Sequence, residues 1–272
     1  MAASPFSIED KVAIVTGGGV GIGKSIALEF ARAGADVVIA SRKLENLEPV
    51  TAEIAKLGRR SFCMALDVRQ EDQVKALVER TVKEMGRLDV MVNNAGASFR
   101  AKVEDISANG WNTVVGINLN GTFFGCKWAG KQMMDQPSGG VIINISSIAG
   151  VYGSTMMSHY GASKAAVINF TRELGMAWGR KGIRVNCIAP GPVETEGYMG
   201  VLTKQDPAAA KKAYDTVAAR VGMGRWGKVE EIAYPCIFLA SAASSFMNGE
   251  TIVINGGAAP QCRPRRRVPL GS

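Results

Sequence analysis

The sequence predicts a single doubly wound α/β domain, in which a parallel sheet carries helices on both faces. The main observation is that short β-branched apolar runs alternate with helical patterns of ten or more residues along most of the 272-residue chain. A second is that no linker or change of composition divides the chain. With 47% apolar residues, a chain of this size buries roughly three quarters of its unfolded surface, which is enough for one large core.

The predicted elements follow one another without interruption. The first strand is expected at 11–16, where the run KVAIVT stops at three glycines. A helix with apolar residues on one face follows at 21–33 and closes at Gly34. The later strands are expected at 37–40, 61–66, 88–92, 141–145, 183–188 and 251–254, and the later helices at 44–57, 71–85, 107–134, 160–180, 207–221 and 229–240.

The net charge of +8 does not indicate a nucleic-acid-binding protein, because four of the charges are arginines in the segment 259–272. This basic tail is expected to be disordered or a cloning remnant, although it is also able to bind phosphates. Residues 1–10 form an N-terminal extension without the features of a secretory signal. No run approaches the roughly 20 apolar residues of a membrane span, so no membrane partner is expected.

The five cysteines form no CxxC pair and lie singly along the chain. Four of them stand in apolar surroundings, which is typical of reduced core residues in a cytoplasmic protein. The chain has one histidine, which nearly excludes a histidine-based metal site, and no metal is expected.

The candidate chemistry centres on Tyr160 and Lys164, which fall on one face of a predicted helix. A phenol beside an ammonium loses its proton more easily, so Tyr160 is a candidate general acid and base. Ser147 ends a predicted strand thirteen residues upstream and is placed to hydrogen-bond the same substrate oxygen. The alternative interpretation is an ordinary surface pair on a helix.

The glycine loop after the first strand allows two interpretations. Residues 18–25 match GxxxxGK[ST], the phosphate loop of nucleoside triphosphatases, with Lys24 on the phosphates and Ser25 on magnesium. That site also needs an acidic residue at the C-terminal end of another strand, whereas Asp89 starts its strand. The pattern Thr16-Gly17-x3-Gly21-x-Gly23 instead suits a dinucleotide, whose pyrophosphate binds at a helix N-terminus. The surrounding motifs favour the dinucleotide.

Over residues 8–258 the chain resembles the short-chain dehydrogenase/reductases. The resemblance is carried by motifs in the family's order and approximate spacing: Thr16-Gly17-x3-Gly21-x-Gly23, Asn93-Asn94-Ala95-Gly96, Asn118, Ser147, Tyr160-x3-Lys164 and Pro190-Gly191. It implies a Rossmann-fold domain spanning 11–258, a seven-stranded sheet of order 3-2-1-4-5-6-7, and a homotetramer.

The resemblance also implies roles for single residues. Tyr160 would be the acid and base, and Ser147 would hold and polarise the substrate oxygen. Lys164 would lower the Tyr160 pKa and bind the nicotinamide ribose, while Asn118 would anchor a water through which protons reach Lys164. Ser146 is expected to be strand filler, Asn93 to brace the glycine loop, and His159 is a weaker alternative base. The remaining cofactor contacts would come from Thr16, Gly17, Gly21, Ile22, Gly23, Asp67, Val68, Asn94, Ala95, Gly96, Pro190, Gly191, Val193 and Thr195.

The end of the second strand indicates which cofactor is used. An acidic residue there would accept hydrogen bonds from the ribose of NAD(H). This chain has Ser41, Arg42 and Lys43 instead, and the guanidinium of Arg42 suits the 2′-phosphate of NADP(H). NADP(H) is therefore favoured and NAD(H) stays open, since two basic residues at a solvated helix start give the same pattern.

The leading hypothesis is an NADP(H)-dependent oxidoreductase that interconverts a carbonyl and a secondary alcohol on a small molecule. Reduction of enoyl or 3-oxoacyl thioesters, a non-catalytic NADP(H)-binding protein and a phosphate-loop ATPase are the alternatives. A substrate lid is expected at about 195–228. Its apolar character predicts a medium-sized, largely apolar substrate, with candidate lining residues Val151, Tyr152, Met156, Met157, Tyr198, Met199, Val201, Leu202, Met223 and Trp226.

Overall fold

The computed structural model describes residues 4–197 and 206–258, and the basic tail lies outside them. Seven parallel strands form one sheet of order β3-β2-β1-β4-β5-β6-β7, which confirms the predicted fold and strand order. The strands are β1 Val12–Thr16, β2 Asp36–Ser41, β3 Ser61–Ala65, β4 Val90–Asn93, β5 Gly140–Ile145, β6 Ile183–Pro190 and β7 Thr251–Ile254.

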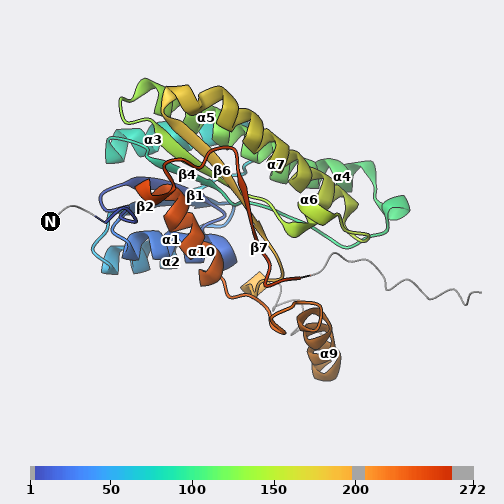
Figure 1. Ribbon diagram of the computed structural model, residues 1–272. Coiled ribbons are helices and arrows are strands. Elements are labelled where there is room, and N and C mark those ends of the chain that lie inside the picture. The colour runs from blue at the N-terminus through green and yellow to red at the C-terminus, as the bar shows by residue number, and fades with distance from the viewer. Residues whose placement is uncertain (1–3, 198–205, 259–272) are drawn as a thin grey trace, which may run out of the picture.

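Helices cover both faces of the sheet (Figure 1). The packing of α1, α2 and α10 against one face forms one apolar core, and α3, α5 and α7 pack against the other. Strands buried on both faces must be apolar throughout, as the β-branched runs of the sequence are. The helices are α1 Gly21–Arg32, α2 Leu44–Lys56, α3 Glu71–Met85, α4 Ala108–Val115, α5 Gly121–Asp135, α6 Ile148–Tyr152, α7 Ser158–Trp178, α9 Pro207–Ala218 and α10 Glu230–Ala240.

The long helix expected at 107–134 is interrupted, which corrects the sequence prediction. A π-helical segment, Gly116–Asn120, joins α4 to α5 and contains Asn118. A π segment adds one residue to a turn, and such segments are frequent at functional sites. The short helix α6 was not predicted, and α9 ends three residues earlier than expected.

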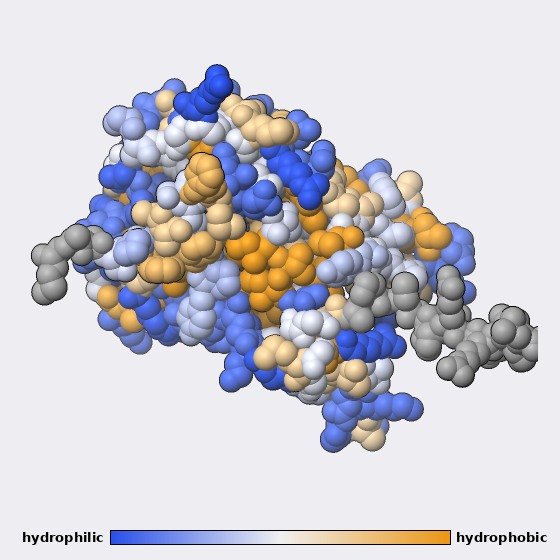
Figure 2. Space-filling view, viewed as in Figure 1, coloured by the Kyte–Doolittle hydropathy of each residue, from blue (hydrophilic) through white to orange (hydrophobic). Residues whose placement is uncertain are grey.

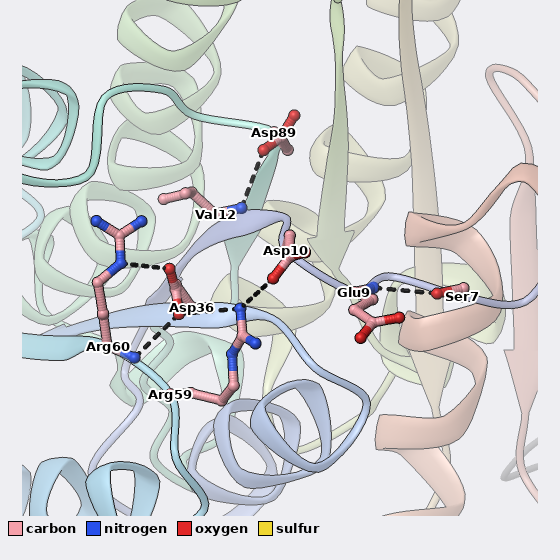
Figure 3. Close-up of polar contacts among 8 residues, drawn as sticks. All are labelled: Ser7, Glu9, Asp10, Val12, Asp36, Arg59, Arg60 and Asp89. Atoms are coloured by element: carbon pink, nitrogen blue, oxygen red, sulfur yellow. Dashed lines mark hydrogen bonds and ion pairs between the residues drawn. The ribbon is translucent and has the colours of Figure 1, made fainter. Parts of the chain in front are cut away.

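Asp36 and Asp89 lie at the N-terminal ends of β2 and β4, at the opposite end of the strands from the glycine loop. Asp36 forms ion pairs with Arg59 at 3.2 Å and Arg60 at 2.7 Å, and Asp89 accepts a hydrogen bond from the Val12 amide at 2.9 Å (Figure 3). Both carboxylates therefore stabilise the start of the sheet. Neither is placed to organise a magnesium ion at the loop, which argues against the ATPase interpretation.

Candidate active site

The glycine loop turns sharply between β1 and α1. Gly17 and Gly21 have φ of 68° and 56°, a region that favours glycine. A Cβ on Gly23 would lie 2.2 Å from the Gly17 carbonyl oxygen, so only glycine permits this approach. The loop glycines thus place no side chain of their own over the start of α1, as close approach of a dinucleotide pyrophosphate requires.

Asn94 holds this loop in place. Its Nδ2 donates to the carbonyl oxygens of Thr16 at 2.9 Å and Gly17 at 3.3 Å, while Thr16 Oγ1 accepts from the amides of Asn94 and Ala95. Asn93 instead points into the core, where its Nδ2 donates to Asn144 Oδ1 at 2.9 Å. The bracing role expected of Asn93 therefore belongs to Asn94.

The groups expected around the adenosine gather beyond the ends of β2 and β3. A side-chain hydrogen bond from Arg69 holds the pKa of Asp67 below its usual value, and the charge of Arg42 contributes in the same direction. Ser41 Oγ donates to the Lys43 carbonyl at 3.4 Å, and Lys43 pairs with Glu45 at 3.5 Å.

The other predicted cofactor residues border the same edge of the sheet. Val68 packs against the start of α5, where a Cβ on Gly121 would lie 2.7 Å from it. Pro190 ends β6, and the Gly191 amide donates to the Ile254 carbonyl at 2.8 Å. Val193 is buried, Ile22 lies in the first turn of α1, and Thr195 approaches Gly21, whose added Cβ would lie 3.3 Å from Thr195 Cβ.

Ser147, Tyr160 and Lys164 come together where the C-terminal end of β5 meets the N-terminal part of α7. Ser147 caps α6, where its Oγ accepts from the Ala149 amide at 3.1 Å, and it also hydrogen-bonds the Tyr160 side chain. Lys164 is buried and its Nζ donates to the Ile145 carbonyl at 2.7 Å. The same Nζ lies 5.8 Å from the centre of the Tyr160 ring.

Burial dominates the protonation of this cluster. It raises the pKa of Tyr160 above its ordinary value, and the hydrogen bond with Ser147 offsets part of that rise. Burial also lowers the pKa of Lys164 to about 8. The Tyr160 pKa is therefore raised in this structure rather than lowered as expected, because desolvation of the phenolate is the largest effect, and the contribution of Lys164 stays a prediction.

Asn118 links three segments of the site. Its Oδ1 accepts from the Ala97 amide at 2.8 Å, and its Nδ2 donates to the Ala97 carbonyl and to Ser163 Oγ, both at 3.0 Å. A Cβ on Gly96 would lie 3.3 Å from Asn118 Oδ1 and 3.5 Å from Lys164 Nζ, so these two polar groups face the same small space. The water-anchoring role of Asn118 stays a prediction.

Two residues near the catalytic group, Ser146 and His159, are both buried. Ser146 is more than strand filler, because its Oγ donates to the Lys164 carbonyl at 2.8 Å and ties β5 to α7. His159 is fully buried and its ring packs on Phe99 with 4.1 Å between ring centres. Burial lowers the His159 pKa, so the imidazole is neutral at neutral pH.

The candidate substrate-lining residues that the structure describes differ in burial: some pack inside the protein and others are exposed. Trp226 is 5% exposed, stacks on Tyr214 and donates from its indole nitrogen to the Tyr214 carbonyl at 3.1 Å. It therefore fixes α9, which extends away from the sheet in Figure 1, rather than lining a substrate pocket. Met223, Val151 and Tyr152 are exposed, while Met156 and Met157 are half-buried. Tyr198, Met199, Val201 and Leu202 lie outside the described residues.

We expect Lys164 to make stability depend on pH. Its folded-state pKa of about 8 is below the ordinary 10.5, so between these values the unfolded chain binds more protons and stability rises with pH. Relative to Lys164→Met, the wild type should gain roughly 2 kcal/mol between pH 7 and pH 10. Urea unfolding at each pH measures this, with Lys212→Met, an exposed site on α9, as the control. If the difference in unfolding free energy between the wild type and Lys164→Met did not change with pH, the lowered pKa of Lys164 would be contradicted.

The fold and the site together define a class of protein, the doubly wound oxidoreductases. The glycine loop between β1 and α1 suits a dinucleotide, and Ser147, Tyr160 and Lys164 lie where its substrate would react. A family model described as enoyl-(acyl carrier protein) reductase matches residues 18–259. The chain belongs to the short-chain dehydrogenase/reductase family.

Three similar proteins span nearly the whole chain. 2-Dehydro-3-deoxy-D-gluconate 5-dehydrogenase of Escherichia coli is 38% identical over 94% of this chain and 98% of its own. 3-Oxoacyl-(acyl-carrier-protein) reductase of Thermotoga maritima is 38% identical over 92% and 98%. A solved structure from Beutenbergia cavernae, described as an NAD(P)-dependent gluconate 5-dehydrogenase with NADP bound at low occupancy, has a TM-score of 0.84 and 34% identity over 93% and 98%.

Proposed function

We propose that this enzyme is an NADP(H)-dependent oxidoreductase that interconverts a carbonyl group and a secondary alcohol. The observation that carries the proposal is the convergence of Ser147, Tyr160 and Lys164 at the C-terminal edge of the sheet, beside the glycine loop. This edge is where open α/β sheets bind their ligands. A carbonyl oxygen needs both a hydrogen-bond donor and a proton source, and Ser147 and Tyr160 supply these two groups.

In this proposal NADP(H) supplies or accepts the hydride, and the protein moves the proton. The Tyr160 hydroxyl donates its proton to the carbonyl oxygen during reduction and recovers it from the alcohol during oxidation. Its raised pKa keeps the phenol protonated at neutral pH, which suits the reductive direction. The Ser147 hydroxyl holds the same oxygen, and Lys164, with a pKa of about 8, returns a proton toward Tyr160.

The preference for NADP(H) is supported by the charges at the end of β2. Arg42 is exposed, and the segment from Ser41 to Lys43 holds no carboxylate to repel a 2′-phosphate. The Beutenbergia cavernae relative was solved with NADP, which favours the same cofactor here. NAD(H) remains the alternative cofactor.

We propose a medium-sized, largely apolar ketone or alcohol as the substrate. The support is the set of apolar side chains near the site, of which Val151, Tyr152 and Met223 are exposed. The Thermotoga maritima relative favours a second candidate, a 3-oxoacyl thioester, while the Escherichia coli relative favours a sugar acid. Values of kcat/KM for cyclic ketones, 3-oxoacyl thioesters and sugar acids at equal NADPH test this. Highest efficiency on a sugar acid would overturn the apolar substrate.

We further propose a homotetramer, because two separate faces of the subunit are suited to self-association. On α5 and α7, a groove of about 190 Å³ is lined by Phe123, Lys127, Lys131, Met134, Phe170, Leu174 and Trp178. A second apolar patch lies over β7, which is an edge strand of the sheet and exposes Val253 (Figure 2). Two distinct two-fold interfaces generate a tetramer, and an unpaired sheet edge also favours pairing with a second copy.

Light scattering should give four times the 28.8 kDa chain mass. Phe123→Glu places a charge on an aromatic residue that is 43% exposed on the α5 groove, and it should reduce the mass to that of a dimer. Glu104→Gln, at an exposed position before α4, is the control and should leave the tetramer intact. A wild-type mass near that of one chain would refute the assembly.

The cellular location that we propose is the cytoplasm. Cys63, Cys126, Cys187 and Cys236 are all free thiols, and the last three are buried. Scattered, unpaired thiols are typical of a reducing compartment. No helix in the described part of the chain combines the length and the apolar character that crossing a membrane requires.

A further inference from the structure

A carboxylate from the segment after β6 lies on the glycine loop. Glu196 Oε2 accepts a hydrogen bond from the Gly21 amide at 3.1 Å, although 175 residues separate the two positions. The neighbouring Thr195 is also close, since a Cβ on Gly21 would lie 3.3 Å from Thr195 Cβ. The segment after β6 therefore contacts the start of α1 through both residues.

The contact gives a hydrogen-bond acceptor to a free backbone amide at the start of α1. The first amides of a helix have no acceptor within the helix, and the helix dipole makes this end favourable for negative charge. Helix α1 has no acidic residue in its first turn, and its N-cap, Val20, makes no side-chain cap bond. Glu196 supplies from another segment the anion that the local sequence of α1 does not provide.

The same place is where the pyrophosphate of the proposed dinucleotide would bind. The single hydrogen of the Gly21 amide cannot serve both acceptors fully, and two anions at the same helix start repel each other. We propose that Glu196 is an internal competitor for the pyrophosphate position, so that cofactor binding requires its carboxylate to leave Gly21. This inference rests on the proposed dinucleotide function and adds a regulatory contact to that site.

The segment that carries Glu196 is also attached to the lid helix. The Glu194 amide donates to the Gly227 carbonyl at 2.9 Å, and the Tyr214 hydroxyl of α9 donates to the Glu194 carboxylate. If the cofactor displaces Glu196, the neighbouring Glu194 should shift as well, and with it the hydrogen bond between Glu194 and Tyr214 of α9. Cofactor binding should thus change hydrogen exchange in α9 as well as at the glycine loop.

Calorimetry on the intact protein tests the proposal with NADPH, NADH and inorganic pyrophosphate as probes. Glu196→Gln keeps an acceptor oxygen but removes the charge, and it should tighten Kd for all three probes by about tenfold. The NADPH-to-NADH affinity ratio should stay unchanged, because the competition concerns the shared pyrophosphate. Glu173→Gln alters the net charge equally at an exposed position on α7 and should change no Kd.

The outcomes separate this inference from the proposed function. If the wild type binds NADPH but Glu196→Gln binds it with equal or weaker affinity, Glu196 is not a competitor and the dinucleotide function stands. If neither protein binds NADPH or NADH, both proposals are overturned. Hydrogen exchange in α9 that is identical with and without NADPH would overturn the connection through Glu194 and Tyr214.

Discussion

Tyr160→Phe should reduce kcat by roughly 10²–10⁴-fold while leaving the Kd of NADPH within a few-fold. The variant removes the hydroxyl that Ser147 contacts but keeps the ring, which is half-buried at the start of α7. Because Phe fills the same space, the packing of α7 and the position of Lys164 should be preserved. Steady-state kinetics and calorimetry measure the two effects separately.

Tyr234→Phe is the matched control for this prediction. Tyr234 is exposed on α10, which covers the opposite face of the sheet from α7, so loss of its hydroxyl should leave kcat close to that of the wild type. Retention of more than about a tenth of the wild-type kcat by Tyr160→Phe would be too much for the loss of a general acid. The proton would then have to come from another group.

The wild type should use NADPH with a higher kcat/KM than NADH, and Arg42→Ala should reduce this preference about 10–100-fold. The reason is that a guanidinium forms two charge-assisted hydrogen bonds with a phosphate, and NADH has no 2′-phosphate to receive them. Arg172→Ala, at an exposed position on α7, removes the same charge away from β2 and should leave the preference intact.

Two results would contradict this account of cofactor choice. Equal or better efficiency with NADH in the wild type would show that the end of β2 does not select NADP(H). An unchanged preference in Arg42→Ala would mean that a different group, such as Lys43, binds the phosphate.

The strands and most helices were predictable because burial determines their composition. Strands of a parallel sheet are covered on both faces, so each appears as an apolar run bounded by turn residues. The bounds of α3 and β7 agree with those predicted. The π segment at Gly116–Asn120 was not predictable, because its single extra residue leaves the apolar pattern on either side unchanged.

The candidate site was only partly predictable. Spacing along the chain correctly brought Ser147, Tyr160 and Lys164 into one cluster. The direction of the Tyr160 pKa was missed, since it depends on how much of the phenol is desolvated after folding. The bonds made by Asn94 and Ser146, and that from Gly21 to Glu196, join residues from different elements, so no local pattern indicates them.

The most direct test of the central claim uses an α,β-unsaturated cyclic ketone and NADPH that carries deuterium at both C4 positions of the nicotinamide, so that transfer from either face carries the label. This substrate offers a C=O bond and a C=C bond to the same site. If Ser147 and Tyr160 act on the carbonyl oxygen, mass spectrometry should find the deuterium on the carbon that bears the new hydroxyl group. Deuterium on the β-carbon of a saturated ketone, or no transfer to this or any other carbonyl substrate, would contradict the account.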